Sequence, residues 1–240
     1  MLVFGAAAPA AAGELVVASA VSLREPVTRI GQGFEARQPE IRVRLSFGGT
    51  NLLAAQLRAG APIDVLLSAD QRIVDDLVRE GLVPGDGHFE LAGNRLVVMA
   101  PPDSAAPLGG PEDLARPAVQ RIAVPESAVP VGHYARQWLA ERGLLEQVLP
   151  KLVPTEHARA ALAAVDYGHV DAAIVYATDA RVARSAIVAF TVPIAEQPRI
   201  RYVAARVARA PESALAGAFL EFLRGAKTRA WLEEAGFLAP

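Results

Sequence analysis

Apolar and polar positions alternate in two distinct ways from Glu14 onward. Short apolar runs bounded by turn residues are typical of buried strands, and longer segments with apolar residues every three or four positions are typical of amphipathic helices. Because the two kinds of segment alternate, the pattern favours βαβ units with parallel strands and the α/β class. The predicted strands are residues 15–20, 43–47, 65–68, 95–100, 121–124, 172–176, 187–190 and 201–207. The predicted helices are residues 23–37, 51–59, 70–80, 131–141, 156–167, 178–183, 212–223 and 226–234.

A change of composition divides this pattern into two parts. Residues 81–93 are rich in Gly and Pro, which is typical of a linker. We therefore expect one lobe from residues 14–92 together with 196–240, and a second lobe from residues 93–195. In open α/β sheets, ligands bind beyond the carboxyl ends of the strands.

Two predicted strands are followed by a hydroxyl residue that begins a helix. Ser22 comes after the first strand, and Glu25 three residues later completes the S-x-x-E pattern of a capping box. Thr50 comes after the second strand and two glycines. Helix N-termini present unpaired N–H groups and a partial positive charge, so the two starts are candidate anion sites. Ser and Thr are also common N-caps, and most N-caps hold no ligand, so taken alone each residue is better interpreted as a cap.

Composition narrows the classes of function. The chain has 240 residues, of which 52% are hydrophobic and 21% charged, so it is long enough to bury a core in each of two lobes. A net charge of -2, with both signs mixed throughout, argues against a nucleic-acid partner or a basic membrane-binding patch. The absence of cysteine excludes disulfides, thiol catalysis and Cys-ligated metals. No two of the four histidines have a metal-ligand spacing, and we interpret all of them as solvated or next to helix caps: His88, His133, His157 and His169.

Residues 1–13 differ from the rest of the chain. They carry no charge and end in small residues, like the end of a secretory signal with an A-x-A cleavage site at residues 8–10 or 10–12. The basic first part of such a signal is missing, which leaves either an export signal that has lost its beginning or a disordered leader. We favour the export signal and expect a periplasmic protein. No other stretch is long and apolar enough to span a bilayer.

An ordered set of segments resembles the periplasmic molybdate-binding proteins of ABC transporters. The resemblance covers nearly everything after the leader, and its most specific piece is Gly-Ala-Pro-x-Asp-Val followed by Ser-Ala-Asp. The matching segments are residues 18–23 (ASAVSL), 47–50 (FGGT), 56–70 (QLRAGAPIDVLLSAD), 125–135 (PESAVPVGHYA), 174–180 (IVYATDA) and 236–237 (GF).

The resemblance implies a two-lobed binding protein of the type II, Venus-flytrap class, in which each lobe is an open mixed sheet flanked by helices. It implies no enzymatic activity and no cofactor; the ligand is molybdate or tungstate, and no protein atom is bonded to the molybdenum. The implied partners are the permease and ATPase subunits of an importer, with no nucleic acid, and the binding protein is a monomer. The implied oxyanion ligands are the hydroxyls of Ser22, Thr50 and Tyr176 and the backbone N–H groups of Val131 and Ala158.

The chemistry of the anion agrees with such a donor set. Molybdate, tungstate and sulfate are fully deprotonated at neutral pH, so they only accept hydrogen bonds, whereas a protonated phosphate also needs an acceptor. The family often has a run of serines where this chain has residues 48–51, and the methyl group of Thr50 takes up cavity volume. A carboxylate facing the anion would repel it, so we interpret the acidic residues of the matched segments as structural: Asp64, Asp70, Glu126 and Asp179. Trp138 and Trp231 lie on apolar helix faces and are expected in the core.

Three alternatives remain open on the sequence. The first is a binding protein for sulfate or another tetrahedral oxyanion. The second is the ligand-sensing lobe of a transcription regulator, although no helix-turn-helix precedes Glu14. The third is an enzyme that combines Ser22 with a histidine and an aspartate, although the nucleophile motif G-x-S-x-G is absent.

Overall fold

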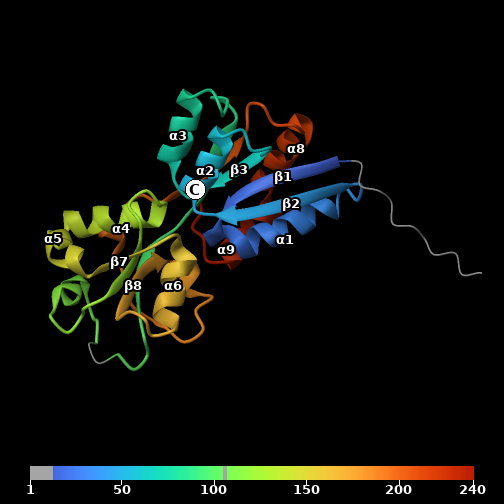
Figure 1. Ribbon diagram of the computed structural model, residues 1–240. Coiled ribbons are helices and arrows are strands. Elements are labelled where there is room, and N and C mark those ends of the chain that lie inside the picture. Colours follow the sequence, from blue (N-terminus) through green and yellow to red (C-terminus); the bar gives the residue numbers. More distant parts are fainter. Residues whose placement is uncertain (1–12, 105–106) are drawn as a thin grey trace, which may run out of the picture.

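The computed structural model describes residues 13–104 and 107–240 and has two lobes that lie end to end (Figure 1). Each lobe is built on one five-stranded sheet. The predicted leader lies outside the described residues except for Gly13, the first residue of β1. Among the described residues, no helix has the length and apolar character needed to cross a membrane.

The sheet of the first lobe has the strand order β2-β1-β3-β10-β4. Its first three strands are parallel, and β10 runs antiparallel to both of its neighbours. The strands are β1 (Gly13–Ala20), β2 (Ile41–Gly48), β3 (Val65–Ser68), β4 (His88–Gly93) and β10 (Arg201–Arg206). The helices are α1 (Arg24–Glu35), α2 (Thr50–Arg58), α3 (Gln71–Arg79), α8 (Ser213–Arg224) and α9 (Ala226–Glu234).

The sheet of the second lobe has the order β7-β6-β8-β5-β9. Here β6 is parallel to β7 and β8, whereas β5 is antiparallel to β8 and β9. The strands are β5 (Leu96–Ala100), β6 (Ile122–Pro125), β7 (Leu152–Thr155), β8 (Ala172–Tyr176) and β9 (Ile187–Thr191). The helices are α4 (Pro130–Glu141), α5 (Leu145–Val148), α6 (Ala158–Asp166) and α7 (Ala177–Ala180), and short 3-10 turns lie at Val21–Leu23, Pro111–Ala115, Leu149–Lys151 and Ile194–Glu196.

Helices cover both faces of each sheet. Side chains of a strand point alternately to its two faces, so a strand with apolar residues at successive positions contributes to the core on both sides. On β10, Tyr202 packs with the cluster that contains α1, α8 and α9, while Val203 packs with α2 and α3. In the second lobe, α4 contributes Trp138 to one face and α6 contributes Leu162 to the other. The prediction that both tryptophans are buried is confirmed, with Trp138 at 0% and Trp231 at 8% exposure. The expected α/β class with open mixed sheets is also confirmed.

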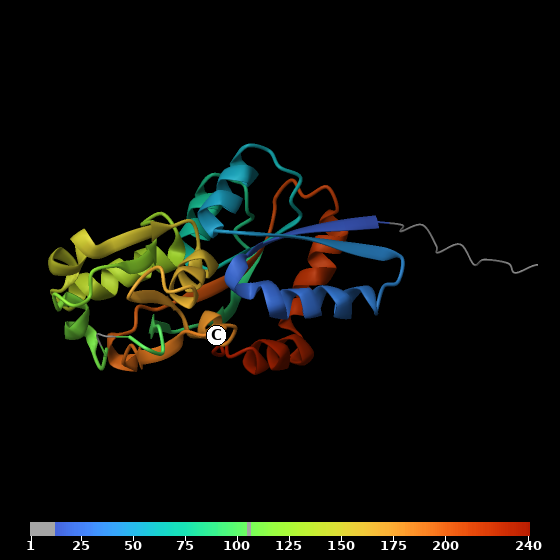
Figure 2. The same ribbon diagram turned by 60° about the horizontal axis from the view of Figure 1, so that its bottom comes forward.

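The chain changes from one sheet to the other twice, at residues 94–95 and at residues 192–200. These two crossings lie side by side between the lobes (Figure 2). On the first-lobe side of the crossing at residues 94–95, Leu238 forms a β-bridge with Gly93, the last residue of β4. The first lobe and second lobe below are the parts of the chain built around the two sheets.

Two strands were not predicted. β4 lies inside residues 81–93, so the interpretation of that whole segment as a linker is wrong. It is an edge strand with three partly exposed residues, and it therefore lacks a continuous apolar run. β7 is also an edge strand, is mostly partly exposed and contains Pro154, which edge strands tolerate. The expected parallel arrangement is wrong for β5, β9 and β10, which are antiparallel to their neighbours.

Candidate functional site

A pocket of about 230 Å³ lies where the two lobes meet. Six strands end there: β1, β2 and β3 from the first lobe and β6, β7 and β8 from the second. This is the edge at which open α/β sheets bind ligands. All five residues predicted as oxyanion ligands line the pocket. The complete lining is Ala20, Val21, Ser22, Gly48, Gly49, Thr50, Ala69, Val129, Pro130, Val131, His157, Ala158 and Tyr176.

Ser22 does not cap a helix, so the predicted capping box is wrong. It lies within the 3-10 turn Val21–Leu23, and the N-cap of α1 is Leu23 with no side-chain hydrogen bond. The inserted turn moves the serine away from the cap position. Its hydroxyl instead lies 2.8 Å from the hydroxyl of Tyr202, and Glu25 forms an ion pair with Arg159 of the second lobe at 2.6 Å. Ser22 is therefore a buried polar residue at the pocket wall.

Thr50 is the first residue of α2, and Gly49 is the N-cap. Its Oγ1 accepts a hydrogen bond from the N–H of Ala69 at 3.1 Å, which leaves the hydroxyl proton free to donate. A Cβ added at Gly49 would lie 2.7 Å from Oδ1 of Asn51, the movable end of that side chain, and 3.4 Å from the carbonyl of Glu156 in the second lobe. The first lobe thus approaches the second closely beside Thr50.

Two helices of the second lobe begin at the pocket. α4 starts with Pro130, which has no N–H, so Val131 carries the first N–H of that helix. A Cβ at Gly132 would lie 2.2 Å from the carbonyl oxygens of residues 125 and 126, so glycine lets α4 start directly against the end of β6. α6 starts at Ala158, next to the N-cap His157. First-turn N–H groups have no acceptor within their own helix, and the helix dipole gives this end partial positive charge.

His157 was interpreted as solvated or next to a cap, and it is a cap that also lines the pocket. Its Nδ1 accepts from the N–H of Ala160 at 3.1 Å. A neutral ring then carries its proton on Nε2, so the histidine adds no acceptor nitrogen beyond the one already used. The predicted helix of residues 156–167 placed His157 inside the helix; the signal for its role was its position directly before Ala158, whose N–H was implied as an oxyanion ligand.

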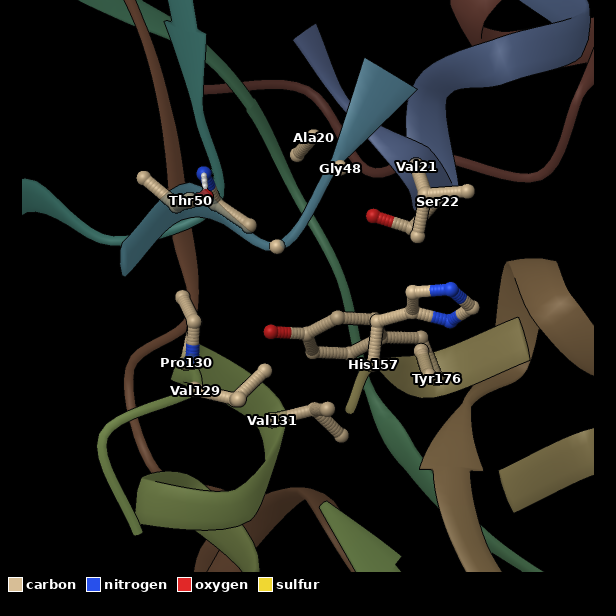
Figure 3. A pocket seen from close by; sticks show the side chains of 13 residues that line it. Ala20, Val21, Ser22, Gly48, Thr50, Val129, Pro130, Val131, His157 and Tyr176 are labelled. Atoms are coloured by element: carbon tan, nitrogen blue, oxygen red, sulfur yellow. Dashed lines mark hydrogen bonds between the residues drawn. The ribbon is translucent and has the colours of Figure 1, made fainter. Parts of the chain in front are cut away.

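Tyr176 ends β8 and is 1% exposed. Its hydroxyl has no hydrogen-bond partner among the described residues. Burial raises the pKa of the Tyr176 phenol well above its ordinary value, so the group keeps its proton at neutral pH. A buried donor without a partner is costly, and such groups are rare in folded proteins. Figure 3 shows the hydroxyls of Ser22 and Tyr176 pointing into the same space between the lobes.

No charged side chain belongs to the pocket lining formed by the described residues. The nearby acidic residues are held by other parts of the protein, as the structural interpretation expects. Asp70 caps α3 and pairs with Arg72 at 2.5 Å, and Asp64 accepts from the N–H groups of Val16 and Glu212. Asp179 lies 2.7 Å from Nε of Arg159. Within the described ranges, no three His, Asp or Glu residues are grouped so that they could hold a metal ion.

The chain is similar to known proteins over nearly its whole length. Residues 15–238 match the family of bacterial extracellular solute-binding proteins. The chain is 31% identical to the molybdate-binding protein ModA of Escherichia coli (strain K12), over 94% of this chain and 89% of that protein. It is also 31% identical to the molybdate-binding protein ModA of Mycobacterium tuberculosis (strain ATCC 25618 / H37Rv), over 95% of this chain and 86% of that protein.

The fold is similar to that of the periplasmic molybdate-binding protein of Azotobacter vinelandii. The TM-score is 0.82 and the sequence identity 23%, over 94% of this chain and 99% of that structure. At this identity the likeness concerns the fold alone.

Proposed function

The chain belongs to the family of bacterial extracellular solute-binding proteins, and we propose that it captures molybdate or tungstate between its lobes for delivery to an ABC importer. Members of this family bind solutes and are not enzymes. The full-length similarity to proteins named for molybdate binding supports the choice of anion. The permease and ATPase subunits of an importer are the proposed partners of a monomeric binding protein.

The observation that carries this proposal is the unpartnered, buried hydroxyl of Tyr176 in a pocket with no charged side chain. Around it lie the hydroxyls of Ser22 and Thr50 and the first N–H groups of α4 and α6. Such groups suit a ligand that carries negative charge on every oxygen and has no proton to donate. Helix N-termini also stabilise an anion without a counter-charge from Lys or Arg.

The summed free energy of the proposed hydrogen bonds is of the size that tight binding requires. A hydrogen bond from a neutral donor to a charged acceptor contributes roughly 1.5–3 kcal/mol net. A dissociation constant of 1 μM requires about 8 kcal/mol. The proposed set is two hydroxyls from the first lobe, one from the second and two backbone N–H groups, so even the low end of the range nearly reaches this value.

Size and protonation then distinguish among the tetrahedral anions. Molybdenum–oxygen and tungsten–oxygen bonds are longer than sulfur–oxygen bonds, so the smaller sulfate would leave some donors out of reach. Phosphate carries a proton near neutral pH, and that proton would face another donor. We therefore expect molybdate and tungstate to bind far more tightly than sulfate, and phosphate to bind negligibly.

Titration calorimetry with molybdate, tungstate, sulfate and phosphate in parallel tests the proposal. We expect one-to-one binding of molybdate and tungstate with sub-micromolar dissociation constants. Sulfate binding of equal or greater strength would identify the protein as a sulfate-binding protein and overturn the size argument. No heat with any of the four anions would overturn the assignment of the pocket.

Export is part of the same proposal. The family to which the chain belongs, bacterial extracellular solute-binding proteins, supports a periplasmic location. Expression of the chain behind a complete signal peptide, followed by separation of periplasm and cytoplasm, tests whether the protein folds and binds molybdate in the exported compartment.

A further inference from the structure

A chain of buried polar side chains continues from Ser22 into the protein. The hydroxyl of Tyr202 lies 2.8 Å from Oγ of Ser22, and Nδ2 of Asn94 lies 3.3 Å from the same phenol oxygen. Nδ2 of Asn94 also lies 2.8 Å from Oγ1 of Thr178. All four residues are at most 4% exposed, and among them only Ser22 lines the pocket described above.

The direction of these hydrogen bonds follows from Asn94. Its Oδ1 accepts from the N–H of Arg95 at 2.8 Å, which identifies the other amide atom as nitrogen. An amide nitrogen only donates, so the oxygen of Tyr202 accepts from Asn94. The proton of Tyr202 then has one partner among the described residues, Oγ of Ser22. In the reverse arrangement, this phenol proton would be buried without an acceptor, which is costly.

The ring of Tyr202 is held in place on both sides. It makes edge-to-face contacts with Tyr176, at 5.8 Å between ring centroids, and with Phe237 at 5.1 Å. The pairing of β10 with β4 shifts register between Tyr202 and Val203, and such irregularities re-aim side chains. Burial also raises the pKa of the Tyr202 phenol, which therefore stays protonated at neutral pH.

We propose that Tyr202 is a positioning residue for anion recognition: by donating to Oγ of Ser22, it directs the serine proton into the pocket. The inference rests on the proposed function, because it concerns how Ser22 meets the bound anion. It also adds a reason for selectivity. A ligand oxygen that carries a proton would meet the serine proton there, so the Asn94–Tyr202–Ser22 arrangement favours oxyanions without a proton.

A double-mutant cycle measured by calorimetry with sodium molybdate tests this role. Tyr202→Phe keeps the ring and removes the donor. We expect it to raise the dissociation constant about three- to tenfold, the range for one neutral hydrogen bond. In the Ser22→Ala background, Tyr202→Phe should change the dissociation constant less than about twofold, because the serine proton that Tyr202 orients is already absent. In the Thr50→Ala background the full effect should remain. Tyr167→Phe, at a 62% exposed tyrosine, controls for the substitution itself.

The outcomes separate this inference from the proposed function. If wild type binds molybdate and Tyr202→Phe weakens binding equally with and without Ser22, the tyrosine acts through packing and the inference is overturned. Unchanged binding by Tyr202→Phe also overturns the inference. If wild type binds none of the four anions, the proposed function fails and the inference fails with it. Should Tyr202→Phe not fold, as judged by circular dichroism, Asn94→Ala replaces it in the cycle, and a loss that does not depend on Ser22 overturns the inference.

Discussion

At the scale of single residues, the three hydroxyls of the pocket differ in their hydrogen-bond partners within the protein. Ser22 is adjacent to Tyr202, and Thr50 accepts from the N–H of Ala69, so both have partners within the protein. Tyr176 has none among the described residues. Removal of its hydroxyl should therefore affect the ligand-bound state alone, whereas removal of the other two also disturbs the protein.

This difference gives a prediction for Tyr176→Phe. We expect molybdate binding to weaken by roughly 1.5–3 kcal/mol, the contribution of one hydrogen bond to a charged acceptor. The free energy of unfolding without ligand should stay nearly the same, because this hydroxyl has no hydrogen-bond partner among the described residues that the substitution could remove. Calorimetry and chemical denaturation measure the two quantities, with Tyr167→Phe as the control. Unchanged affinity would exclude Tyr176 from the site.

A second residue-scale prediction concerns Asp179, which is fully buried next to Arg159. Burial raises the pKa of this carboxyl to about 6, although the charge of Arg159 opposes the shift. Between the ordinary aspartate pKa of about 4 and the raised value, the folded state binds more protons than the unfolded state, so this group makes stability fall as pH rises. Asp179→Asn cannot titrate. We expect denaturation midpoints of wild type to fall relative to the variant from pH 4.5 to pH 7, and parallel profiles would contradict the shift.

Single residues also show what the sequence can reveal. The motifs at Ser22, Thr50 and Tyr176 identified side chains that the fold brings into one pocket, because each motif places its residue at the carboxyl end of a strand. The motif did not reveal the orientation of Ser22. Its actual partner, Tyr202, is 180 residues away, and no local pattern encodes that contact. The capping-box prediction failed for a local reason, because the 3-10 turn Val21–Leu23 makes Leu23 the N-cap of α1.

At the scale of elements, prediction succeeded where a segment has its own complete pattern. The central strands β1, β3 and β8 are short apolar runs: β3 and β8 were predicted with the bounds that the structure shows, and β1 was predicted to start at residue 15 where it starts at Gly13. The edge strands β4 and β7 were missed, because partial exposure breaks the apolar run. Strand direction was the other failure: β10 pairs antiparallel with β3 only because the chain returns from the second lobe, and this depends on the whole topology.

The start of α6 allows a backbone donor to be tested. Ala158→Pro removes the N–H of the first helical residue, where proline is well tolerated. The preceding residue, His157, is extended with φ -165 and ψ 170, which is compatible with a following proline. Ala158→Val is the matched control, because it adds bulk at the same position and keeps the N–H. We expect the proline variant to bind molybdate more weakly than the valine variant by roughly 1.5–3 kcal/mol. Equal affinities would mean that this N–H does not reach the anion.

At the scale of the whole molecule, the proposed donors come from both lobes, so a small anion can contact all of them only when the lobes are close together. Contacts between the lobes include the ion pair between Glu25 and Arg159 at 2.6 Å and the approach of Gly49 to the backbone of Glu156. Without an anion, the donors have to be hydrated, which favours a more open arrangement. The anion interacts better with the closed arrangement and shifts the population toward it.

The ion pair and the anion contribute differently to this closure. Glu25 is 48% exposed at its side chain, and exposed ion pairs contribute about 0–1 kcal/mol. Several hydrogen bonds to a charged ligand contribute far more. We therefore expect small-angle scattering to show a smaller radius of gyration with saturating molybdate than without it, and Glu25→Gln to show nearly the same decrease. Tyr176→Phe should need more molybdate to reach the same decrease in the radius of gyration.

Two outcomes would contradict this account of closure. A scattering profile that molybdate leaves unchanged in wild type, while calorimetry shows tight binding, would mean that the anion is held without closure and that one lobe supplies the donors. Loss of the decrease in Glu25→Gln would instead make the ion pair, and not the anion, the contact that closes the lobes.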